Sequence, residues 1–411
     1  MQSRRRLLFL LPFAPNAEAA HGGSRVIAQL ITQLAARHTI ALLYLRAASE
    51  LPADALVQSR CDLVESITRP DPGFCLTDGW SRIGSLARGL PMWAAGSAIT
   101  AYRARVRAVV KTWRPDIVQF EYPVMGQYLA ALDGCRAPRV LTEHEPAAKA
   151  ARELFESHRG IGRLGYWIDW LAWQRFERNV VKQVQTVVVF TERDRRELAR
   201  FGSSTPIVRI TLGTVLPEQS LNPLGSDPLS ILFFGSFRHP PNVDAAIRLI
   251  TAILPGVRAR YPKILLYIVG DQPPREIRSL ANKNIIVTGR VPDVTPYLDK
   301  AAVVVVPLRL GGGMRVKVLE ALAAGKPIVA SPLAVEGLQV ANGKQVLLAD
   351  NDDQFSVAII ELLHAPEQRL SLAVSARKWA CSHLGWEPSI QAYEDLYDRL
   401  LTRSHETVGS Q

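Results

Sequence analysis

Glycine, cationic and acidic residues are concentrated in one stretch of the chain, PLRLGGGMRVKVLEALAAGKPIVASPLAVEGL, at residues 307–338. The pattern predicts the end of a buried strand, a triple-glycine turn, a helix and a second strand. Because glycine has no Cβ atom, backbone N–H groups in such a turn can come close to a ligand. The helix that follows adds unpaired N–H groups and a partial positive charge at its N-terminus, which favours phosphate binding.

Three ionic side chains extend this candidate phosphate site. Arg315 and Lys317 place full positive charges in the first turn of the predicted helix, and Glu320 lies three residues after Lys317, so the last two share a helix face. Exposed backbone, two cations and one carboxylate together suit a diphosphate attached to a hydroxyl-rich sugar. The same residues also fit a glycine-rich connection followed by a surface helix with a Lys–Glu pair, so spacing alone leaves both interpretations open.

The stretch resembles the donor-binding signature of GT-B glycosyltransferases, specifically of the large retaining family 4, whose pattern is PL..GGG.R.K.LEA(L/M)A.GKP(I/V)V.S....EGL. The resemblance implies an α/β fold of two Rossmann-like, doubly wound parallel-sheet domains that face each other across a cleft. It also implies a nucleoside-diphosphate sugar as donor and no cofactor or metal. The donor-binding residues that it implies here are Gly311, Gly312, Gly313, Met314, Arg315 and Glu320.

Two positions of this signature concern carboxylates. Glu320 matches the family glutamate that binds the ribose hydroxyls of the donor. Many members carry a second glutamate eight positions earlier, where this chain has Gly312. The chain therefore resembles the branch in which a glycine-rich loop replaces that first acid.

Residues 229–246, LSILFFGSFRHPPNVDAA, resemble the segment that opens the donor domain. A strand is predicted to end at Gly235, and Arg238 follows in a loop at its carboxyl end, where α/β sheets bind ligands. We expect Arg238 and Lys317 to contact the diphosphate, although a solvated loop arginine fits the same position. Further along, the family uses loop backbone at the positions of Arg290 and Val291 to hold the nucleobase.

The first half contains two candidate segments. Gly22 and Gly23 follow the first predicted strand and resemble the family loop that closes over the donor diphosphate, although a simple turn fits them too. The sequence LTEHEP ends another strand, and in an extended segment Glu143 and Glu145 lie on one side, about 7 Å apart, with His144 on the other. The family has a histidine or acid here that contacts the donor sugar. We therefore predict His144 as the catalytic contact, followed as candidates by Glu143 and by Glu121 at the end of DIVQFE, with a structural histidine as the alternative.

A chain of 411 residues is long for a single hydrophobic core. Short apolar runs alternate with helical patterns in both halves, which predicts βαβ units and parallel sheets. The strands are expected at 6–12, 39–45, 116–120, 138–142, 186–190, 206–210, 230–235, 264–269, 284–288, 302–306, 327–331 and 346–349. We expect an acceptor-side domain over 1–212, a linker within 211–228, a donor domain over 226–386 and a crossover helix at about 387–402 that packs back on the first domain.

Two helix starts are predicted from capping residues. Thr191 and Asp194 form a pattern like a capping box before the helix ERDRRELARF. Asn242, which follows two prolines, is expected to start the helix VDAAIRLITAIL.

The net charge of +11 is unevenly distributed. Residues 1–225 contain 29 Lys and Arg against 20 Asp and Glu, whereas the remainder contains 20 against 18. A basic first half indicates an anionic partner, either a charged lipid surface or an acidic acceptor. No nucleic-acid-binding module is evident. Four widely spaced cysteines predict reduced thiols and no zinc site.

The amino-terminal apolar run, residues 7–13, fits a buried first strand better than an export signal, and no window approaches the roughly 20 apolar residues of a spanning helix. We therefore expect a cytoplasmic protein that can bind peripherally to the inner face of the cell membrane. Trp167, Trp170 and Trp173 recur every three residues near basic side chains. Such a helix could dock on anionic lipid, but tryptophans at helical spacing also fit an ordinary core.

The leading functional hypothesis is a retaining, metal-independent transferase that moves a sugar from a nucleoside-diphosphate sugar to a glycan or lipid-linked acceptor. By analogy with the family, it would act in the assembly of cell-surface polysaccharide or lipopolysaccharide. The leaving diphosphate gains negative charge in the transition state, where preplaced cations stabilise it most. The alternatives are a nucleotide-sugar epimerase of the same fold, hydrolysis by the pair Glu143 and Glu145, and a non-enzymatic two-lobed binding protein.

Overall fold

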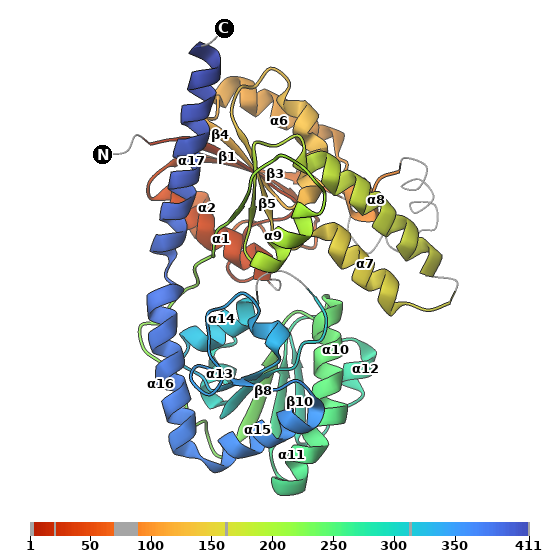
Figure 1. Cartoon of the computed structure of the whole chain (residues 1–411), viewed down its shortest axis with the longest axis vertical. Helices are drawn as coiled ribbons and strands as arrows, with labels where there is room; N and C mark the ends of the chain where they lie inside the picture. Colours follow the sequence, from red (N-terminus) through yellow and green to blue (C-terminus); the bar gives the residue numbers. More distant parts are fainter. Residues whose placement is uncertain (1–3, 20–21, 70–88, 161–162, 312–314, 410–411) are drawn as a thin grey trace.

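The computed structural model describes residues 4–19, 22–69, 89–160, 163–311 and 315–409. It contains two α/β domains stacked end to end, each built on a parallel sheet (Figure 1). The predicted fold class, two doubly wound domains with a C-terminal crossover helix, is confirmed.

The first sheet has seven strands in the order β3-β2-β1-β4-β5-β6-β7. Their bounds, in chain order, are β1 (Arg6–Leu11), β2 (Thr39–Arg46), β3 (Leu63–Thr68), β4 (Ile117–Glu121), β5 (Arg139–Glu143), β6 (Thr186–Val189) and β7 (Ile207–Arg209). Strand β1 pairs with both β2 and β4, so the strand order reverses there. At such a switch point a crevice opens at the carboxyl ends of the strands. The residues that follow β1 and β4 therefore meet at that crevice.

The second sheet has six strands in the order β10-β9-β8-β11-β12-β13. Their bounds are β8 (Ser230–Phe234), β9 (Leu265–Val269), β10 (Ile285–Gly289), β11 (Val303–Val306), β12 (Ile328–Ala330) and β13 (Leu347–Leu348). The order reverses between β8 and β11, so the loop after β8 and the glycine loop after β11 share the switch point of this domain.

Every strand expected from the apolar runs is present within a residue or two. The additional strand, β3, was not predicted, because its sequence LVESIT is half-exposed at the edge of the sheet and carries no buried apolar run. By contrast, the amino-terminal apolar run forms β1, whose residues from Leu7 to Leu11 are completely buried at the centre of the sheet.

Helices cover both faces of each sheet. Those of the first domain are α1 (Gly22–Ala35), α2 (Ala55–Arg60), α5 (Met92–Gly96), α6 (Thr100–Trp113), the 3₁₀ helix η1 (Pro123–Leu132), α7 (Ala147–Ser157), α8 (Arg163–Val181) and α9 (Glu192–Ala199). Those of the second are α10 (Pro240–Arg248), the π turn η2 (Leu249–Ile253), α11 (Leu254–Arg260), α12 (Arg275–Arg278), α13 (Thr295–Lys300), α14 (Val316–Ala323), the 3₁₀ helix η3 (Pro332–Val335), α15 (Asp352–His364) and α16 (Pro366–His383).

The two predicted helix starts differ in outcome. The Thr191 side chain accepts a hydrogen bond from the backbone N–H of Asp194 and caps α9, as expected. The prediction for Asn242 is wrong, because α10 already begins at Pro240. A proline fits the first helical turn, where its fixed φ is suitable and no N–H is required. The Asn242 side chain is thereby released for contacts outside the helix.

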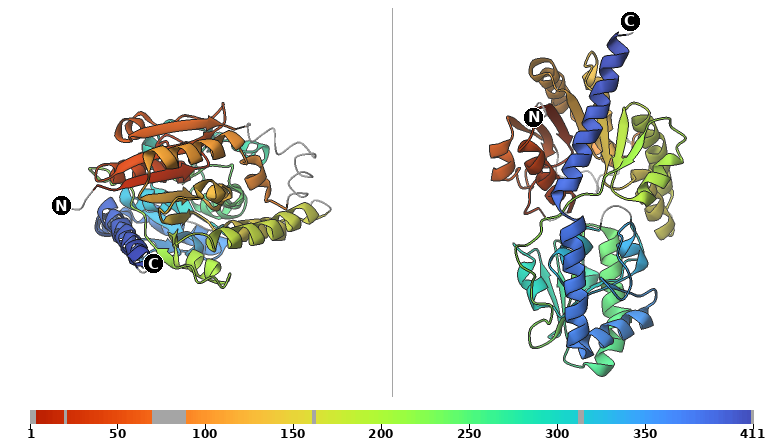
Figure 2. Two further views of the ribbon diagram at one scale, coloured as in Figure 1. Left: turned by 90° about the horizontal axis from the view of Figure 1, so that it is seen from above. Right: turned by 60° about the vertical axis from the view of Figure 1, so that its left-hand side comes forward.

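The last helix, α17 (Trp386–Gly409), crosses from the second domain to the first. Helix α16 packs on α14, and α17 continues along the same side of the molecule onto the first domain (Figure 2). Its apolar face completes the core on one side of the first sheet through Ile390, Tyr393, Leu396, Tyr397 and Leu400. Among the described residues, no helix is both long and apolar enough to cross a membrane.

Candidate active site

Two helix N-termini meet where the domains face each other. Helix α1 follows β1 in the first domain, and α14 follows the glycine loop of the second. A Cβ atom placed on Gly22 would lie 3.3 Å from the Cγ2 atom of Val316, the first residue of α14. Each N-terminus carries unpaired N–H groups and a partial positive charge. Their convergence makes this part of the interface favourable for an anion.

The glycine loop of the second domain is described only at its first glycine. Gly311 has a φ of +104°, which favours glycine. Its N–H donates to the carboxylate of Glu153 at 3.1 Å, and its carbonyl accepts from Arg193 and Arg315. Both backbone groups therefore bind side chains, and two of these come from the first domain. Gly312, Gly313 and Met314, predicted to bind the donor, lie outside the described residues.

Lys317 is the second residue of α14, and its side-chain amine lies at the carboxyl end of β8. Its Nζ donates to Oδ1 of Asn242 and is 4.8 Å from the ring centroid of Phe233. A Cβ atom on Gly235 would lie 3.0 Å from that Nζ, so the absence of a side chain at Gly235 makes room for the amine. Burial, with a smaller contribution from the charge of Arg315, lowers the pKa of Lys317 to about 7. The sequence therefore places a readily titrated amine beside the switch point.

The two predicted arginines point in different directions. Arg238 is half-exposed, and its Nε lies 3.2 Å from a carboxylate oxygen of Asp271, at the end of the neighbouring strand β9. Arg315 lines a narrow crevice between the domains together with Phe190, Thr191 and Thr211 of the first domain. Burial lowers the pKa of Arg315, and the charge of Glu145 opposes that shift. Arg315 thus reaches across to the first domain, whereas Arg238 remains on the rim of the second.

Glu320 occupies the same helix as Lys317 and faces the first domain. Its Oε1 is 3.2 Å from Nη1 of Arg25, which belongs to α1. Burial raises the pKa of Glu320, and the charges of Arg25 and Lys317 counteract the shift. Arg25 was not singled out from the sequence. Its position two residues after the glycine pair Gly22 and Gly23 was the available signal.

His144 lies at the carboxyl end of β5, next to the switch point of the first domain. Its Nε2 is 2.6 Å from Oε2 of Glu121, a completely buried carboxylate at the end of β4. The imidazole stacks on Tyr122, with ring centroids 4.2 Å apart and an interplanar angle of 7°. Phe190 meets the ring edge at a centroid distance of 4.9 Å. His144 and Glu121, two of the candidates from the sequence, are therefore hydrogen-bonded to each other within an aromatic enclosure, and sequence spacing indicated neither feature.

The prediction that Glu143 supports catalysis needs correction. Its side chain points to the opposite face of β5 from the flanking residues Thr142 and His144 and is completely buried. Burial, followed by the negative charges of Glu177 and Asp194, raises the pKa of Glu143 well above its usual range. A carboxylate in this position has no access to a substrate. The hydrolytic pair of Glu143 and Glu145 loses one of its members for the same reason.

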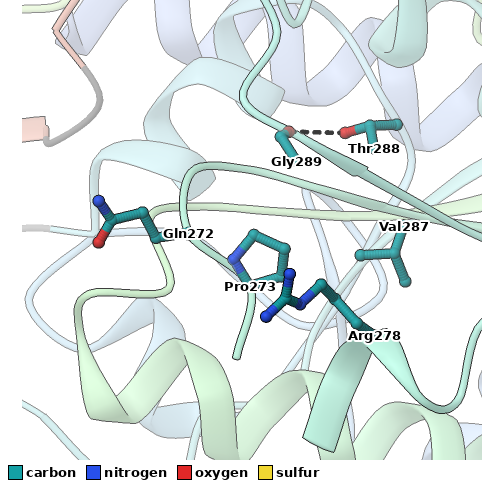
Figure 3. A pocket seen from close by; sticks show the side chains of 6 residues that line it. All are labelled: Gln272, Pro273, Arg278, Val287, Thr288 and Gly289. Carbon is teal, nitrogen blue, oxygen red and sulfur yellow. Dashed lines mark hydrogen bonds between the residues drawn. The ribbon is translucent and has the colours of Figure 1, made fainter. Parts of the chain in front are cut away.

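A cavity of about 430 Å³ opens at the carboxyl ends of β9 and β10 (Figure 3). Its lining residues are Gln272, Pro273, Arg278, Val287, Thr288 and Gly289. Arg290 and Val291, predicted to lie around the nucleobase, follow immediately. Arg290 donates to the carbonyl of Glu18 in the first domain at 3.2 Å, and Val291 packs on the core of the second. Across the described part of the chain, no cluster of three or more His, Cys, Asp or Glu side chains could hold a metal ion.

Comparison with known proteins identifies families that match both halves of the chain. Residues 20–215 match the family model described as Glycosyltransferase Family 4, and residues 228–365 match the model described as Glycosyl transferases group 1. A GDP-mannose-dependent alpha-(1-6)-phosphatidylinositol monomannoside mannosyltransferase from Mycolicibacterium smegmatis is 28% identical over 149 residues, which are 32% of this chain and 39% of that protein. The aligned part thus spans about two fifths of that relative's own length.

Solved structures show the same fold over nearly the whole chain. Sucrose-phosphate synthase from Thermosynechococcus elongatus has a TM-score of 0.70 and 17% identity, and the match covers 97% of this chain and all of that one. Anabaena HepE in complex with UDP and glucose has a TM-score of 0.63 and 14% identity, with 99% of this chain covered and 100% of that chain. Identities this low establish the fold and leave the substrate open.

Proposed function

The chain belongs to glycosyltransferase family 4 (glycosyl transferases group 1) and has the GT-B fold, and we propose that it transfers a sugar from a nucleoside-diphosphate sugar with retention of anomeric configuration. We further propose that the donor binds to the domain formed by residues 226–386 and the acceptor to residues 1–212. The acceptor would be a glycan or lipid-linked molecule in the assembly of cell-surface polysaccharide or lipopolysaccharide. The mannosyltransferase relative, whose name specifies a phosphatidylinositol-based acceptor, supports the lipid-linked alternative.

The observation that carries this proposal is the meeting of α1, α14 and Lys317 at the interface between the domains. Two positive helix ends and the Lys317 amine converge on the strand ends of the second domain. A diphosphate placed there would keep Lys317 protonated. As the bond from the sugar to the diphosphate breaks, negative charge grows on the leaving group, and these preplaced groups stabilise it more than the ground state. Arg238 would contribute after exchanging Asp271 for phosphate.

The remaining roles follow from position along the interface. Glu320 would receive the ribose hydroxyls in exchange for Arg25, and the cavity at the ends of β9 and β10 would take the nucleobase, next to the backbone of Arg290 and Val291. His144, held by Glu121, would contact the transferred sugar from the side of the first domain. Gly22, the first residue of α1, would close over the diphosphate together with Gly23.

The test begins with a thermal-shift screen of UDP-, GDP-, ADP- and dTDP-sugars, because a ligand that binds only the folded state raises the melting temperature. The stabilising donor is then incubated with glycan and lipid-linked acceptors, and free nucleoside diphosphate is measured. Transfer predicts release that requires an acceptor and falls sharply in Lys317→Ala. Release without any acceptor indicates hydrolysis, and conversion of the donor without release indicates an epimerase.

We also propose that the protein binds the inner face of the cell membrane peripherally through α8. Helices α7 and α8 extend from the side of the first domain (Figure 1). Leu164, Trp167 and Leu171 are exposed by 60%, 41% and 40%, and their spacing places them on one helical face. Trp170 instead stacks on Phe155 of α7, and Trp173 is buried.

The charges of α8 favour an anionic surface. Both of its acidic residues turn inward, where Asp169 accepts from the N–H of Met92 and Glu177 accepts from the N–H groups at the start of α7. Arg163 and Arg178 are exposed on the same helix. A helix with an exposed apolar stripe and basic flanks lies in the interface of anionic bilayers.

Vesicle co-sedimentation tests this surface. The protein is expected to bind vesicles of anionic phospholipid at low salt and to bind less at high salt. The double variant Trp167→Ser/Leu171→Ser should lose that binding. The matched control, Leu370→Ser/Val374→Ser, removes two exposed apolar side chains of α16 in the second domain and should bind normally. Equal binding by both variants would exclude α8 as the docking surface.

A further inference from the structure

A buried glutamine in a central strand is the starting point. Strand β4, with the sequence IVQFE, lies in the middle of the first sheet and is completely buried. Gln119 and Glu121 are two residues apart, so their side chains share one face of the sheet. A buried amide is costly unless all of its polar atoms are hydrogen-bonded, and an apolar residue would suit this strand better. The contacts of Gln119 account for its presence.

Gln119 connects the crossover helix to the site. The hydroxyl of Tyr397, on α17, donates to Oε1 of Gln119 at 2.5 Å. Nε2 of Gln119 donates to Oε1 of Glu121 at 2.7 Å and to Oγ1 of Thr142 at 3.2 Å. The other oxygen of Glu121 meets Nε2 of His144 at 2.6 Å. Tyr397, Gln119 and Glu121 are all completely buried.

The direction of each hydrogen bond in this chain is determined by chemistry. A flipped amide would turn the oxygen of Gln119 toward the carboxylate of Glu121, where two acceptors would repel each other. The NH₂ group of Gln119 must therefore face Glu121, and its oxygen must face the O–H of Tyr397. Glu121 then accepts a hydrogen bond from the Nε2–H of His144. This leaves Nδ1 as the ring nitrogen that can contact a substrate.

We propose that Tyr397 and Gln119 are positioning residues, which hold Glu121 and through it fix the orientation and tautomer of His144. The inference rests on the proposed function only for its kinetic consequence, because the hydrogen-bond chain itself can be tested without activity. The crossover helix α17 would therefore help to position the side chains in the first domain's half of the site. Helix α16, which precedes α17, packs on α14, so the C-terminal helices contact both halves.

The test observes His144 directly by NMR of protein labelled at histidine Cε1, with the signal of His144 identified as the one missing in His144→Gln. Tyr397→Phe removes one hydroxyl and keeps the ring, and it is expected to move the His144 signal. Gln119→Leu breaks the chain at its centre and should move that signal further. Tyr102→Phe is the matched control: Tyr102, on α6 of the same domain, is equally buried, and its hydroxyl donates to the carbonyl of Leu43 on β2 rather than to Gln119 or Glu121.

A His144 signal that stays in place in Tyr397→Phe, or that moves equally in Tyr102→Phe, overturns the proposal whether or not the protein is a transferase. Should Tyr397→Phe not fold, as judged from its melting curve, Gln119→Leu and Gln119→Met decide in the same way. In the transferase assay, Tyr397→Phe should lower kcat about three- to tenfold, the equivalent of one buried hydrogen bond, with little change in donor KM. That loss should vanish in a His144→Ala background. An equal loss there would mean that Tyr397 acts independently of His144.

Discussion

Donor affinity is expected to fall as the pH rises through neutrality because of Lys317. Burial and the charge of Arg315 lower the pKa of this amine to about 7. A bound diphosphate would raise the pKa again, so binding takes up a proton wherever the free amine is neutral. The group is charged below its pKa and loses that charge above it. The electrostatic contribution of Lys317 to donor binding is therefore available at acidic pH without proton uptake and weakens above pH 7.

The magnitude follows from the protonated fraction. One pH unit above the pKa, about a tenth of the amine is charged, so the affinity for the donor should drop about tenfold between pH 6 and pH 8. The assay is isothermal titration of the stabilising nucleotide sugar, whose pyrophosphate diester does not itself titrate in this range. Repeating it in two buffers of different ionisation enthalpy counts the protons taken up.

Lys317→Met provides the comparison, since it keeps a long apolar stem beside Phe233 and removes the charge. The variant should bind the donor weakly, with an affinity that does not depend on pH in this interval. A wild-type affinity that is constant from pH 6 to pH 8, or a pH dependence that survives in Lys317→Met, would refute the assignment of Lys317 to the diphosphate.

Two further predictions concern Glu143, which lies away from Lys317, and Gly235, which lies beside it. Burial raises the pKa of Glu177 to about 7 and that of its neighbour Glu143 well above the usual range. The stability that these protonated groups allow is therefore fully present below about pH 4.5 and is lost as the pH rises through the raised pKa values, by roughly 3 kcal/mol for a shift of the size shown by Glu177. In Glu143→Gln, the free energies of urea unfolding at about pH 5 and pH 8 should differ much less than in the wild type, whereas an unchanged difference would mean that other groups cause it. Gly235→Ala places a methyl group 3.0 Å from both Nζ of Lys317 and Nδ2 of Asn242, on backbone with a φ of +155°. The substitution should cost about 1–3 kcal/mol of stability and weaken donor binding. A variant with the melting temperature and donor affinity of the wild type would contradict the close approach described for Lys317.

The sheets could be predicted from the sequence because parallel strands buried on both faces are continuous apolar runs. Strand β3 lacked that signal, since an edge strand with LVESIT exposes alternate residues. The helix carrying Lys317 and Glu320 could be located from its glycine loop. The alternation of β5 correctly separated His144 from Glu143, but the sequence did not indicate which face of the strand opens to the interface. That depends on α8 and α9, which place Glu177 and Asp194 beside Glu143.

Contacts between segments that are far apart in the sequence could not be predicted from such patterns. Arg25 reaches Glu320 only because α1 and α14 meet end to end, and Asn242 binds Lys317 because two prolines start α10 earlier than its capping residue suggested. Likewise, the three hydrogen bonds from Tyr397 to His144 join residues from three elements. In the sequence, Gln119 and Glu121 are polar side chains inside the otherwise apolar strand IVQFE.

The route of the last helix has a consequence for synthesis. The first domain is translated first, yet one face of its sheet is covered by side chains from Ile390 to Leu400, which leave the ribosome only after the whole second domain. Domains generally fold in the order of their synthesis, but this one must wait with the part of that face not covered by α1 and α2 exposed. A released fragment of residues 1–230 should therefore be sensitive to proteases and bind hydrophobic dyes, and addition of a peptide spanning 386–403 should protect it.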